Sequence, residues 1–276
     1  MSEIDVVHLV WKPAGLESFR RFLDSYREFP AEVDHHLLVL FKAFRGDDLE
    51  EYRAHLAGIP HRELLVPNTF LDLGAYFYAA ARAEGRFLCF LNSHATVLAA
   101  GWLRRLYENV TQPGVAAAGS TGSWESFYTN YLRRIEEVGP PKSLTDRAKH
   151  LNRLRKLRSY KANFHPEPNP HLRSNAFIVE RARWLALTHG SLRTKCSSWL
   201  FESGKRGLTP QLTAQGLEVV VVGRDGRGYP QKEWRQSKTF RSGDQGNLLV
   251  ADNRTRQYAE ADEELKQYLR ELAWGR

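Results

Sequence analysis

Residues 85–94, GRFLCFLNSH, indicate the fold class of this chain. Their centre, Phe87 to Leu91, is an uninterrupted run of five apolar residues. Such a run is typical of a central strand that is covered on both faces of a parallel sheet. We therefore expect a parallel sheet with Asn92, Ser93 and His94 directly beyond the carboxyl end of one strand.

The residues before and after this segment alternate between strand and helix patterns. The Ala-rich stretch from Asp72 to Glu84 predicts a helix with Gly85 in the C′ position. Strand and helix alternate with short connections, which predicts a right-handed, doubly wound α/β sheet that is mostly parallel, with flanking helices. The other strands expected in this half of the chain lie at residues 6–11, 37–41, 63–66 and 115–118.

The regular alternation ends near residue 122. Residues 139–171 are strongly basic, and three prolines predict an extended loop over 163–170. Strands are expected again at 175–179 and 217–222, and two short helices separated at Gly204 and Gly207 are expected between them. Residues 223–246 predict a long loop, and residues 259–273 predict a C-terminal amphipathic helix with Leu265, Tyr268, Leu269 and Leu272 directed inward.

The composition is that of a globular protein that favours anionic partners. Of the 276 residues, 42% are hydrophobic and 12% aromatic, which excludes a disordered chain. Forty Lys and Arg residues against 32 Asp and Glu give a net charge of +8, which favours phosphates, nucleic acid or an anionic membrane face. Two cysteines provide neither a disulfide framework nor a zinc site. With no signal peptide and no membrane-spanning run, we expect a cytoplasmic location, including the inner face of the membrane.

Several common catalytic motifs are absent. No G-x-G-x-x-G follows the first expected strand, so the dinucleotide fingerprint is missing. The segment SGKR at 203–206 is not a P-loop, and GSTG at 119–122 is not the elbow of α/β-hydrolases. The sequence therefore gives no support to hydride transfer, P-loop phosphoryl transfer or serine hydrolysis.

Polar and aromatic residues follow the expected parallel strands. In open α/β sheets, ligands bind beyond the carboxyl ends of the strands. These ends should line one rim that supplies an aromatic ring, cations and polar ligands, which suits a nucleotide diphosphate. The segments concerned are 11–13, with Trp11, Lys12 and Pro13, 42–44, with Lys42, 68–72, with Asp72, and 92–94, with Asn92, Ser93 and His94.

Four segments together resemble a known enzyme family. Residues 85–95 with Gly-Trp-Leu at 101–103 resemble the segment around the D-x-D motif of family 2 and related GT-A glycosyltransferases. Residues 67–74 and 171–179 are similar to two stretches of the rhamnan-synthesis branch. WLFESG at 199–204 falls where the family places the acidic element that holds its catalytic base.

This resemblance implies a GT-A-like fold and a nucleotide-sugar-dependent hexosyl- or deoxyhexosyltransferase. The acceptor would be a glycan or a lipid-linked saccharide, and the reaction would invert the anomeric centre with Glu202 as the base. The chain would be one domain, 1–276, with a donor half at 1–122, an acceptor half at 123–250 and a C-terminal helix within 251–276. Donor contacts are expected from Trp11, Lys12, Pro13, Lys42, Asp72, Asn92, Ser93 and His94, and acceptor or diphosphate contacts from His171, Arg173, Arg224, Trp234 and Arg235.

The sequence departs from the family at the metal-binding motif. Asn92 and His94 stand where the family has the two aspartates of D-x-D, which hold Mg²⁺ or Mn²⁺ on the donor diphosphate. A metal held by these two residues would be bound more weakly. In the alternative, no metal is used and side-chain cations neutralise the diphosphate. These cations would come from Arg224, Arg227, Lys232, Arg235, Lys238 and Arg241.

Other interpretations stay open at this point. Asn92-Ser93-His94 can be a turn that caps a helix, and Glu202 can be a surface carboxylate. The chain could be a GT-A-like protein that has lost catalysis and only binds carbohydrate or serves as a scaffold. Its charge also permits nucleic-acid binding, but no nucleic-acid module is recognisable, so that partner is not expected. The basic stretch from Lys142 to Lys161 is either a solvated helix face or a surface that docks on an anionic membrane.

Overall fold

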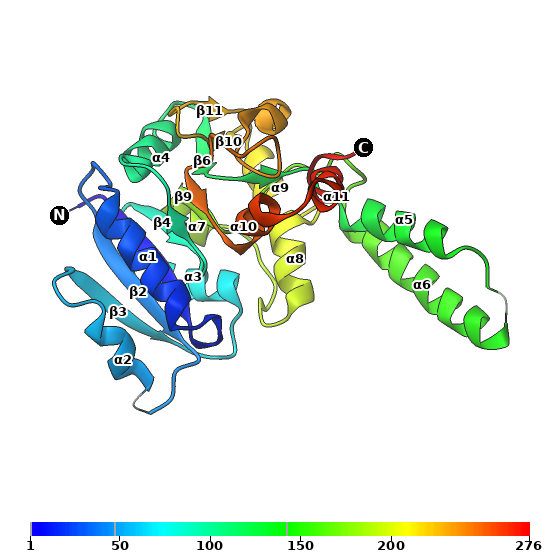
Figure 1. Ribbon diagram of the computed structural model, residues 1–276, viewed down its shortest axis with the longest axis horizontal. Helices are drawn as coiled ribbons and strands as arrows, with labels where there is room; N and C mark the ends of the chain where they lie inside the picture. Colours follow the sequence, from blue (N-terminus) through cyan, green and yellow to red (C-terminus); the bar gives the residue numbers. More distant parts are fainter. Residues whose placement is uncertain (1, 47, 142) are drawn as a thin grey trace.

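The architecture was obtained as a computed structural model, which describes residues 2–46, 48–141 and 143–276. An eight-stranded sheet has the order β11-β10-β6-β9-β4-β1-β2-β3, with helices on both faces (Figure 1). Its strands are β1 (Ile4–Trp11), β2 (His36–Lys42), β3 (His61–Val66), β4 (Phe87–Leu91), β6 (Val115–Gly119), β9 (Ala176–Glu180), β10 (Glu218–Val222) and β11 (Gly228–Tyr229). Two small sheets pair β5 (Thr96–Val97) with β12 (Val250–Ala251) and β7 (Gly122–Ser123) with β8 (His171–Leu172).

The helices divide between the two faces of the large sheet. Side chains of α1, α2 and α4 form one buried cluster, and those of α3, α7, α8 and α9 form the other. The strands supply both clusters, because successive residues of a strand point to opposite faces. These helices are α1 (Leu16–Glu28), α2 (Asp48–Ala54), α3 (Asp72–Ala80), α4 (Trp102–Val110), α7 (Arg181–Leu185), α8 (Lys195–Ser203) and α9 (Leu208–Thr213), and the short 3-10 helices are η1 (Lys12–Ala14) and η2 (Gln231–Ser237).

The predicted fold class is confirmed, with one strand reversed. β4, β1, β2 and β3 are parallel neighbours, as are β6 and β10. β9 lies between β4 and β6 and is antiparallel to both. Its apolar pattern is the same in either direction, so the sequence did not indicate this reversal. Because β9 is reversed, its amino end lies at the same edge of the sheet as the carboxyl ends of β1, β2 and β4.

Gly85 does not cap a helix, which corrects one prediction. α3 ends at Ala80, before the predicted end at Glu84. The Asp5 carboxylate instead accepts hydrogen bonds from the backbone N–H groups of Glu84 (2.9 Å) and Gly85 (2.8 Å). A Cβ atom on Gly85 would lie 2.8 Å from the backbone nitrogen of Asp5, so glycine is required by the close approach to β1.

We expect Gly85→Ala to lower the free energy of unfolding by about 1–3 kcal/mol, because the added methyl group overpacks a backbone contact. Gly190 is a suitable control, since a Cβ atom there meets nothing within 4 Å. Urea denaturation of both variants measures the difference. Equal midpoints for Gly85→Ala and Gly190→Ala would contradict this account of Gly85.

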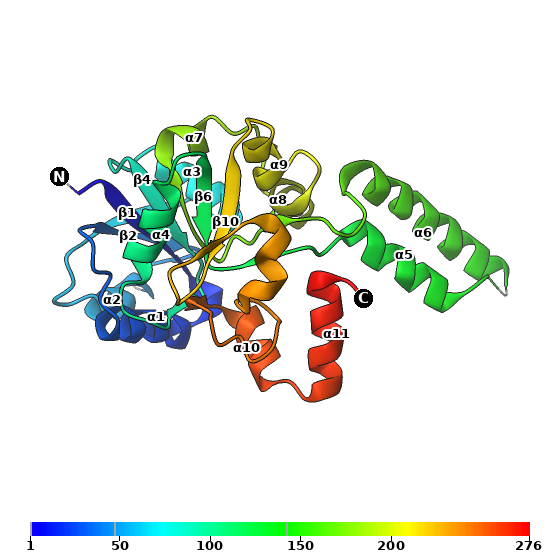
Figure 2. The same cartoon turned by 90° about the horizontal axis from the view of Figure 1, so that it is seen from above.

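The basic insertion is part of a helical arm. α5 (Phe127–Val138) and α6 (Leu144–Asn163) pack against each other and project away from the sheet (Figures 1 and 2). The prediction of an extended segment is confirmed for residues 164–170, while Asn163 ends the helix. Lys142 lies outside the described residues. Among the described helices, none is long and apolar enough to cross a membrane.

The C-terminal segment contains two helices where one was predicted. α10 (Asn253–Glu260) and α11 (Glu263–Trp274) are separated at Ala261, and Asp262 caps the second. Leu269 is buried as predicted, but Leu265 and Tyr268 are exposed. The inward face of α11 instead carries Ala273 and Trp274, because α11 packs through its last turn. The two short helices α8 and α9, separated at Gly204 and Gly207, are confirmed.

Candidate functional site at the carboxyl edge of the sheet

The ends of β1 and β2 bring an aromatic ring and a cation together. Trp11 and Lys42 are the last residues of these parallel strands and lie directly opposite each other. The Lys42 ammonium is 5.5 Å from the centre of the Trp11 ring, and the indole is partly exposed. Lys42 is buried, and burial lowers its pKa while the nearby Asp72 carboxylate raises it. A buried cation at this edge is well placed to attract an anionic ligand.

Asp72 connects the strand ends electrostatically with Glu202. It is the first residue of α3 and keeps contact with solvent, although protein surrounds its carboxylate on most sides. This desolvation raises the pKa of the Asp72 carboxyl group. The charges of Lys42 and His94 lower that pKa, and the charge of Glu202 raises it. Groups from β2, α3, the turn after β4 and α8 are therefore close enough to act on one carboxylate. We name these four residues, Lys42, Asp72, His94 and Glu202, the edge cluster.

The turn Asn92-Ser93-His94 is fixed by its own hydrogen bonds. The Asn92 side-chain oxygen accepts from the His94 backbone N–H at 3.0 Å. The Ser93 hydroxyl accepts from the Trp11 backbone N–H at 3.2 Å, which ties the turn to the end of β1. The His94 Nδ1 atom and the Ser18 hydroxyl share a hydrogen bond of 3.0 Å. Burial and the Arg256 guanidinium lower the pKa of His94, while the carboxylates of Asp252 and Asp72 raise it.

Asn92 and His94 fit a divalent cation poorly. Mg²⁺ and Mn²⁺ prefer several oxygen ligands, above all carboxylates. The Asn92 oxygen is neutral and already accepts a hydrogen bond, and His94 Nδ1 is engaged with Ser18. Within residues 2–46, 48–141 and 143–276, no group of three or more His, Cys, Asp or Glu side chains could hold a metal ion.

Glu202 lies on α8 and is held by Ser174, which lies just before β9. One carboxylate oxygen, Oε1, accepts from both the backbone N–H (2.8 Å) and the hydroxyl (2.7 Å) of Ser174. These two bonds orient the carboxylate, and no described residue is hydrogen-bonded to Oε2. Gly204 ends α8 and packs on the backbone of Leu200, where a Cβ atom would clash.

Arg173 forms a buried ion pair with a residue from the C-terminal segment. Its guanidinium donates to the Asp252 carboxylate at 2.7 Å and to the Thr121 hydroxyl at 3.2 Å. Burial alone would raise the pKa of Asp252, but Arg173 and the Thr255 backbone N–H lower it overall. Asp252 also caps α10 through its other oxygen. Arg173 therefore positions the C-terminal segment and is not free to bind a ligand in this state.

Sequence reasoning missed several residues of this edge. Arg256 of α10 donates to the His94 carbonyl (3.2 Å) and to the Thr96 hydroxyl (3.1 Å). Ser174, Ser18 and Asp252 were also given no role. Ser174 lies within the recognised segment 171–179, which was the one available signal. Arg256 and Asp252 are more than 150 residues from His94 in sequence, and only the packing of β12 against β5 brings them there.

Some residues predicted to bind the donor or the acceptor have other partners. Lys12 pairs with Asp48 at 3.2 Å and lies over the Tyr52 ring, so its charge is directed toward α2. Pro13 is exposed in η1 beside it. His171 is buried, and its Nδ1 atom bonds to the Asn169 carbonyl. Lys12 and His171 are therefore engaged with protein partners, which does not support the contacts predicted for them.

The predicted loop residues are also mostly engaged elsewhere. Trp234 is fully buried and donates to the Tyr229 carbonyl at 2.9 Å, so it is a core residue and contacts no acceptor. Arg224 donates to the Leu248 carbonyl at 2.9 Å, and Arg235 is exposed on η2. Arg241 differs from these residues, because it lies near the Arg173–Asp252 pair.

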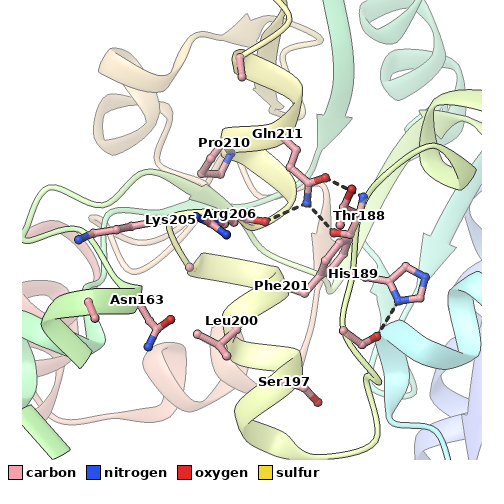
Figure 3. Close-up of a pocket in the computed structure, with 14 residues that line it drawn as sticks. Asn163, Thr188, His189, Ser197, Leu200, Phe201, Lys205, Arg206, Pro210 and Gln211 are labelled. Atoms are coloured by element: carbon pink, nitrogen blue, oxygen red, sulfur yellow. Dashed lines mark hydrogen bonds between the residues drawn. The ribbon is translucent and has the colours of Figure 1, made fainter. Parts of the chain in front are cut away.

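A cavity of 980 Å³ lies on a different face of α8 (Figure 3). Ser197, Leu200 and Phe201 line it, and the helical spacing places them on the side of α8 opposite Glu202. The Gln211 side chain inside it is bonded to the backbone of Thr188 and of Arg206. The amide group of Gln211 therefore has its hydrogen bonds within the protein and is not free to bind a ligand. We place the functional site at the edge cluster.

Comparisons with solved structures show the fold. The mannosyltransferase PcManGT from Pyrobaculum calidifontis, solved with GDP-Man and Mn²⁺, is similar over 86% of this chain and 60% of its own, with a TM-score of 0.50 and 14% identity. Glucosyl-3-phosphoglycerate synthase from Mycobacterium tuberculosis covers 66% of this chain and 56% of its own, with a TM-score of 0.35 and 20% identity. No family model and no curated protein sequence matches. The chain has a GT-A-type fold and spans 60% of the length of the mannosyltransferase.

Proposed function

We propose that this protein is a nucleotide-sugar-dependent glycosyltransferase that acts on a glycan or a lipid-linked saccharide. The observation that carries the proposal is the edge cluster, in which Glu202 is held by Ser174 at the edge where GT-A-type sheets expose their strand ends. The sequence resemblance of residues 85–95, 101–103 and 199–204 supports the same reaction class. Assignment to the rhamnan-synthesis branch stays a prediction, as does the choice between a hexose and a deoxyhexose.

In this proposal the donor lies across the ends of β1, β2 and β4. The partly exposed Trp11 ring offers an apolar face for the nucleobase. Asp72 would contact the ribose or the sugar, because a carboxylate accepts hydrogen bonds from their hydroxyl groups. The diphosphate would lie beside the Asn92-Ser93-His94 turn, to which Arg256 is hydrogen-bonded, and Lys42 lies next to Trp11 at the same edge.

Inversion requires one base and one stabilised leaving group. The acceptor hydroxyl attacks the anomeric carbon as its proton passes to Glu202, and the bond from that carbon to the diphosphate oxygen breaks with its electron pair. Ser174 fixes Oε1, so Oε2 is the atom that would take the proton. The charge that develops on the diphosphate must be offset by cations placed in advance.

We propose that side-chain cations, including Arg241, neutralise the diphosphate in place of a metal. Arg241 is 5% exposed and lies over the same Phe240 ring as Arg173. Among the described residues, no carboxylate forms an ion pair with Arg241, and its Nε atom has no hydrogen-bond partner. Burial and Arg173 lower the pKa of Arg241 to about 10, which leaves it charged at neutral pH. A buried, unpaired cation is destabilising, and an anionic ligand would relieve that cost.

A thermal-shift panel of UDP-, GDP-, dTDP- and CMP-linked sugars tests this proposal. We expect one donor class to raise the melting temperature by about 5 °C at saturation, because a ligand that binds only the folded state stabilises it. The shift should be the same in EDTA as in Mn²⁺. A shift seen only with Mn²⁺ would contradict the role given to the cations. No shift with any donor, in either condition, would contradict nucleotide-sugar binding itself.

The acceptor side is proposed to lie beyond Trp199. This exposed indole precedes Glu202 by three residues on α8 and stacks on Phe127 with ring centres 4.9 Å apart. Phe127 also lines a cavity of 580 Å³, together with Tyr131, Tyr160 and Tyr268. Aromatic faces suit the apolar faces of sugar rings. This arrangement supports a saccharide acceptor over a small polar one.

A further inference from the structure

The outward face of α6 carries an unusual combination of side chains. Residues spaced by three or four positions share one face of a helix. On the side of α6 turned away from α5, next to the exposed Asn152 and Ser159, one exposed face of the helix holds only leucine, arginine and alanine. These residues are Leu144, Arg147, Ala148, Leu151, Leu154, Arg155, Arg158 and Ala162. We call this set the outer stripe.

The outer stripe leaves apolar surface in water. Leu144 is 80% exposed and Leu151 is 51% exposed, and both belong to the few large apolar side chains that this chain exposes. Neither α5 nor α6 contains a fully buried residue over its described length. Two helices that bury so little of their surface gain little stability from packing. A partner that covers the outer stripe would stabilise the arm.

The charges on the arm favour an anionic partner. No residue of the outer stripe is acidic, and Arg147, Arg155 and Arg158 lie between its leucines. Asp146, the acidic residue of α6, accepts a hydrogen bond from Ser143 at the start of the helix and is not on the outer stripe. The other acids of the arm, Glu136 and Glu137, belong to α5.

We propose that the arm docks on an anionic phospholipid surface, with α6 lying along the bilayer and its outer stripe facing the lipid. Leucine side chains would enter the boundary between head groups and acyl chains, and the arginines would bind lipid phosphates. Long arginine side chains can bury their methylene groups while the guanidinium reaches the phosphates. Alternating leucine and arginine suits a lipid surface better than nucleic acid, whose backbone offers nothing apolar to bind.

The base of the arm is joined to the helix that carries Glu202. Lys205, three residues after Glu202, donates from its backbone N–H to Asn163 and from its ammonium to the Lys161 carbonyl, both at 2.8 Å. With α6 lying along the bilayer, these two hydrogen bonds keep the end of α8 close to the base of the docked arm. Membrane docking does not depend on the proposed enzymatic function, although it would bring a lipid-linked acceptor within reach.

Vesicle flotation tests the docking proposal on the full chain. The probes are vesicles of phosphatidylcholine alone and of phosphatidylcholine with 30% phosphatidylglycerol. We expect binding to the anionic vesicles to be about tenfold stronger and to weaken at high salt. The variant Leu144→Glu/Leu151→Glu should reduce this binding at least about tenfold. The matched control is Leu65→Glu/Leu185→Glu, which changes two leucines that are 60% and 43% exposed outside the arm, and it should bind as the unmodified protein does.

Each other outcome overturns the proposal. Equal binding of the Leu144→Glu/Leu151→Glu variant and the control would show that the outer stripe does not contact lipid. Failure of the unmodified protein to bind anionic vesicles would have the same consequence. A random single-stranded oligonucleotide that binds tightly, and that displaces the protein from vesicles, would identify the stripe as a nucleic-acid surface. Circular dichroism should show unchanged helix content, since all four substituted side chains are exposed.

Discussion

Replacing Glu202 with glutamine should lower the rate of sugar transfer by roughly 10²–10⁴-fold, the usual contribution of a general base. Glutamine keeps the size of the side chain and can still accept from Ser174 through its amide oxygen, but it cannot take the acceptor proton. Donor binding should therefore change little. The measurement is the transfer rate under saturating donor, together with the donor-induced thermal shift of the same variant.

Two further variants make the result on Glu202 specific. Glu108→Gln changes an exposed glutamate of α4 that pairs with Arg104, and it should leave the transfer rate unchanged. Ser174→Ala removes the hydroxyl donor but keeps the backbone N–H that also holds Oε1, so we expect a smaller loss than for Glu202→Gln. Near-normal transfer by Glu202→Gln would remove Glu202 from the role of base. Loss of donor binding in that variant would indicate that Glu202 contacts the donor.

Replacing Asp252 with alanine should lower the free energy of unfolding by about 3–5 kcal/mol, because it leaves the Arg173 guanidinium buried without its partner. Loss of the cap on α10 adds about 1 kcal/mol. Asp262→Ala is the matched control, since Asp262 caps α11 at the surface and forms no ion pair with a described residue. Asp262→Ala should lower the free energy of unfolding, measured by urea denaturation, by about 1 kcal/mol. Equal losses in the two variants would show that the Arg173–Asp252 pair contributes nothing beyond the cap.

The stabilisation by Asp252 has a defined pH dependence. Its pKa in the folded protein lies below the ordinary value of 3.8, so its contribution is fully present above that value. As the pH falls through the lower pKa of the folded state, Asp252 is protonated and the contribution is lost. The difference in stability between the unmodified protein and Asp252→Ala should thus be constant above about pH 5 and shrink below pH 4.

The strand ends could be predicted because local pattern determines them. Continuous apolar runs specify buried parallel strands, and the residues that follow such runs must lie at one edge of the sheet. Lys42, Asp72 and His94 were placed at this edge on that basis, and the structure brings them near Glu202. The roles of these residues stay predictions.

Partners from distant elements could not be predicted in the same way. Sequence spacing gave Lys12 a place at the donor site, but the nearby carboxylate of Asp48 directs it to α2. Trp234 was predicted to contact the acceptor or the diphosphate, but its ring packs on Gly122 in the core. Sequence spacing also gave no sign that Ser174 would hold Glu202. Each of these side chains interacts with a partner that the tertiary packing places next to it. The sequence alone does not show which residues the packing brings together.

The sequence by itself determined the α/β class, the parallel strands and the residues at their carboxyl ends, because strand burial and chain direction leave a local apolar pattern. Tertiary structure alone decided the reversed direction of β9, the projection of the α5–α6 arm and the placing of Arg256 and Asp252 beside the edge cluster. These features arise from contacts between segments far apart in the chain, and the apolar spacing within each segment is the same whichever neighbour it meets.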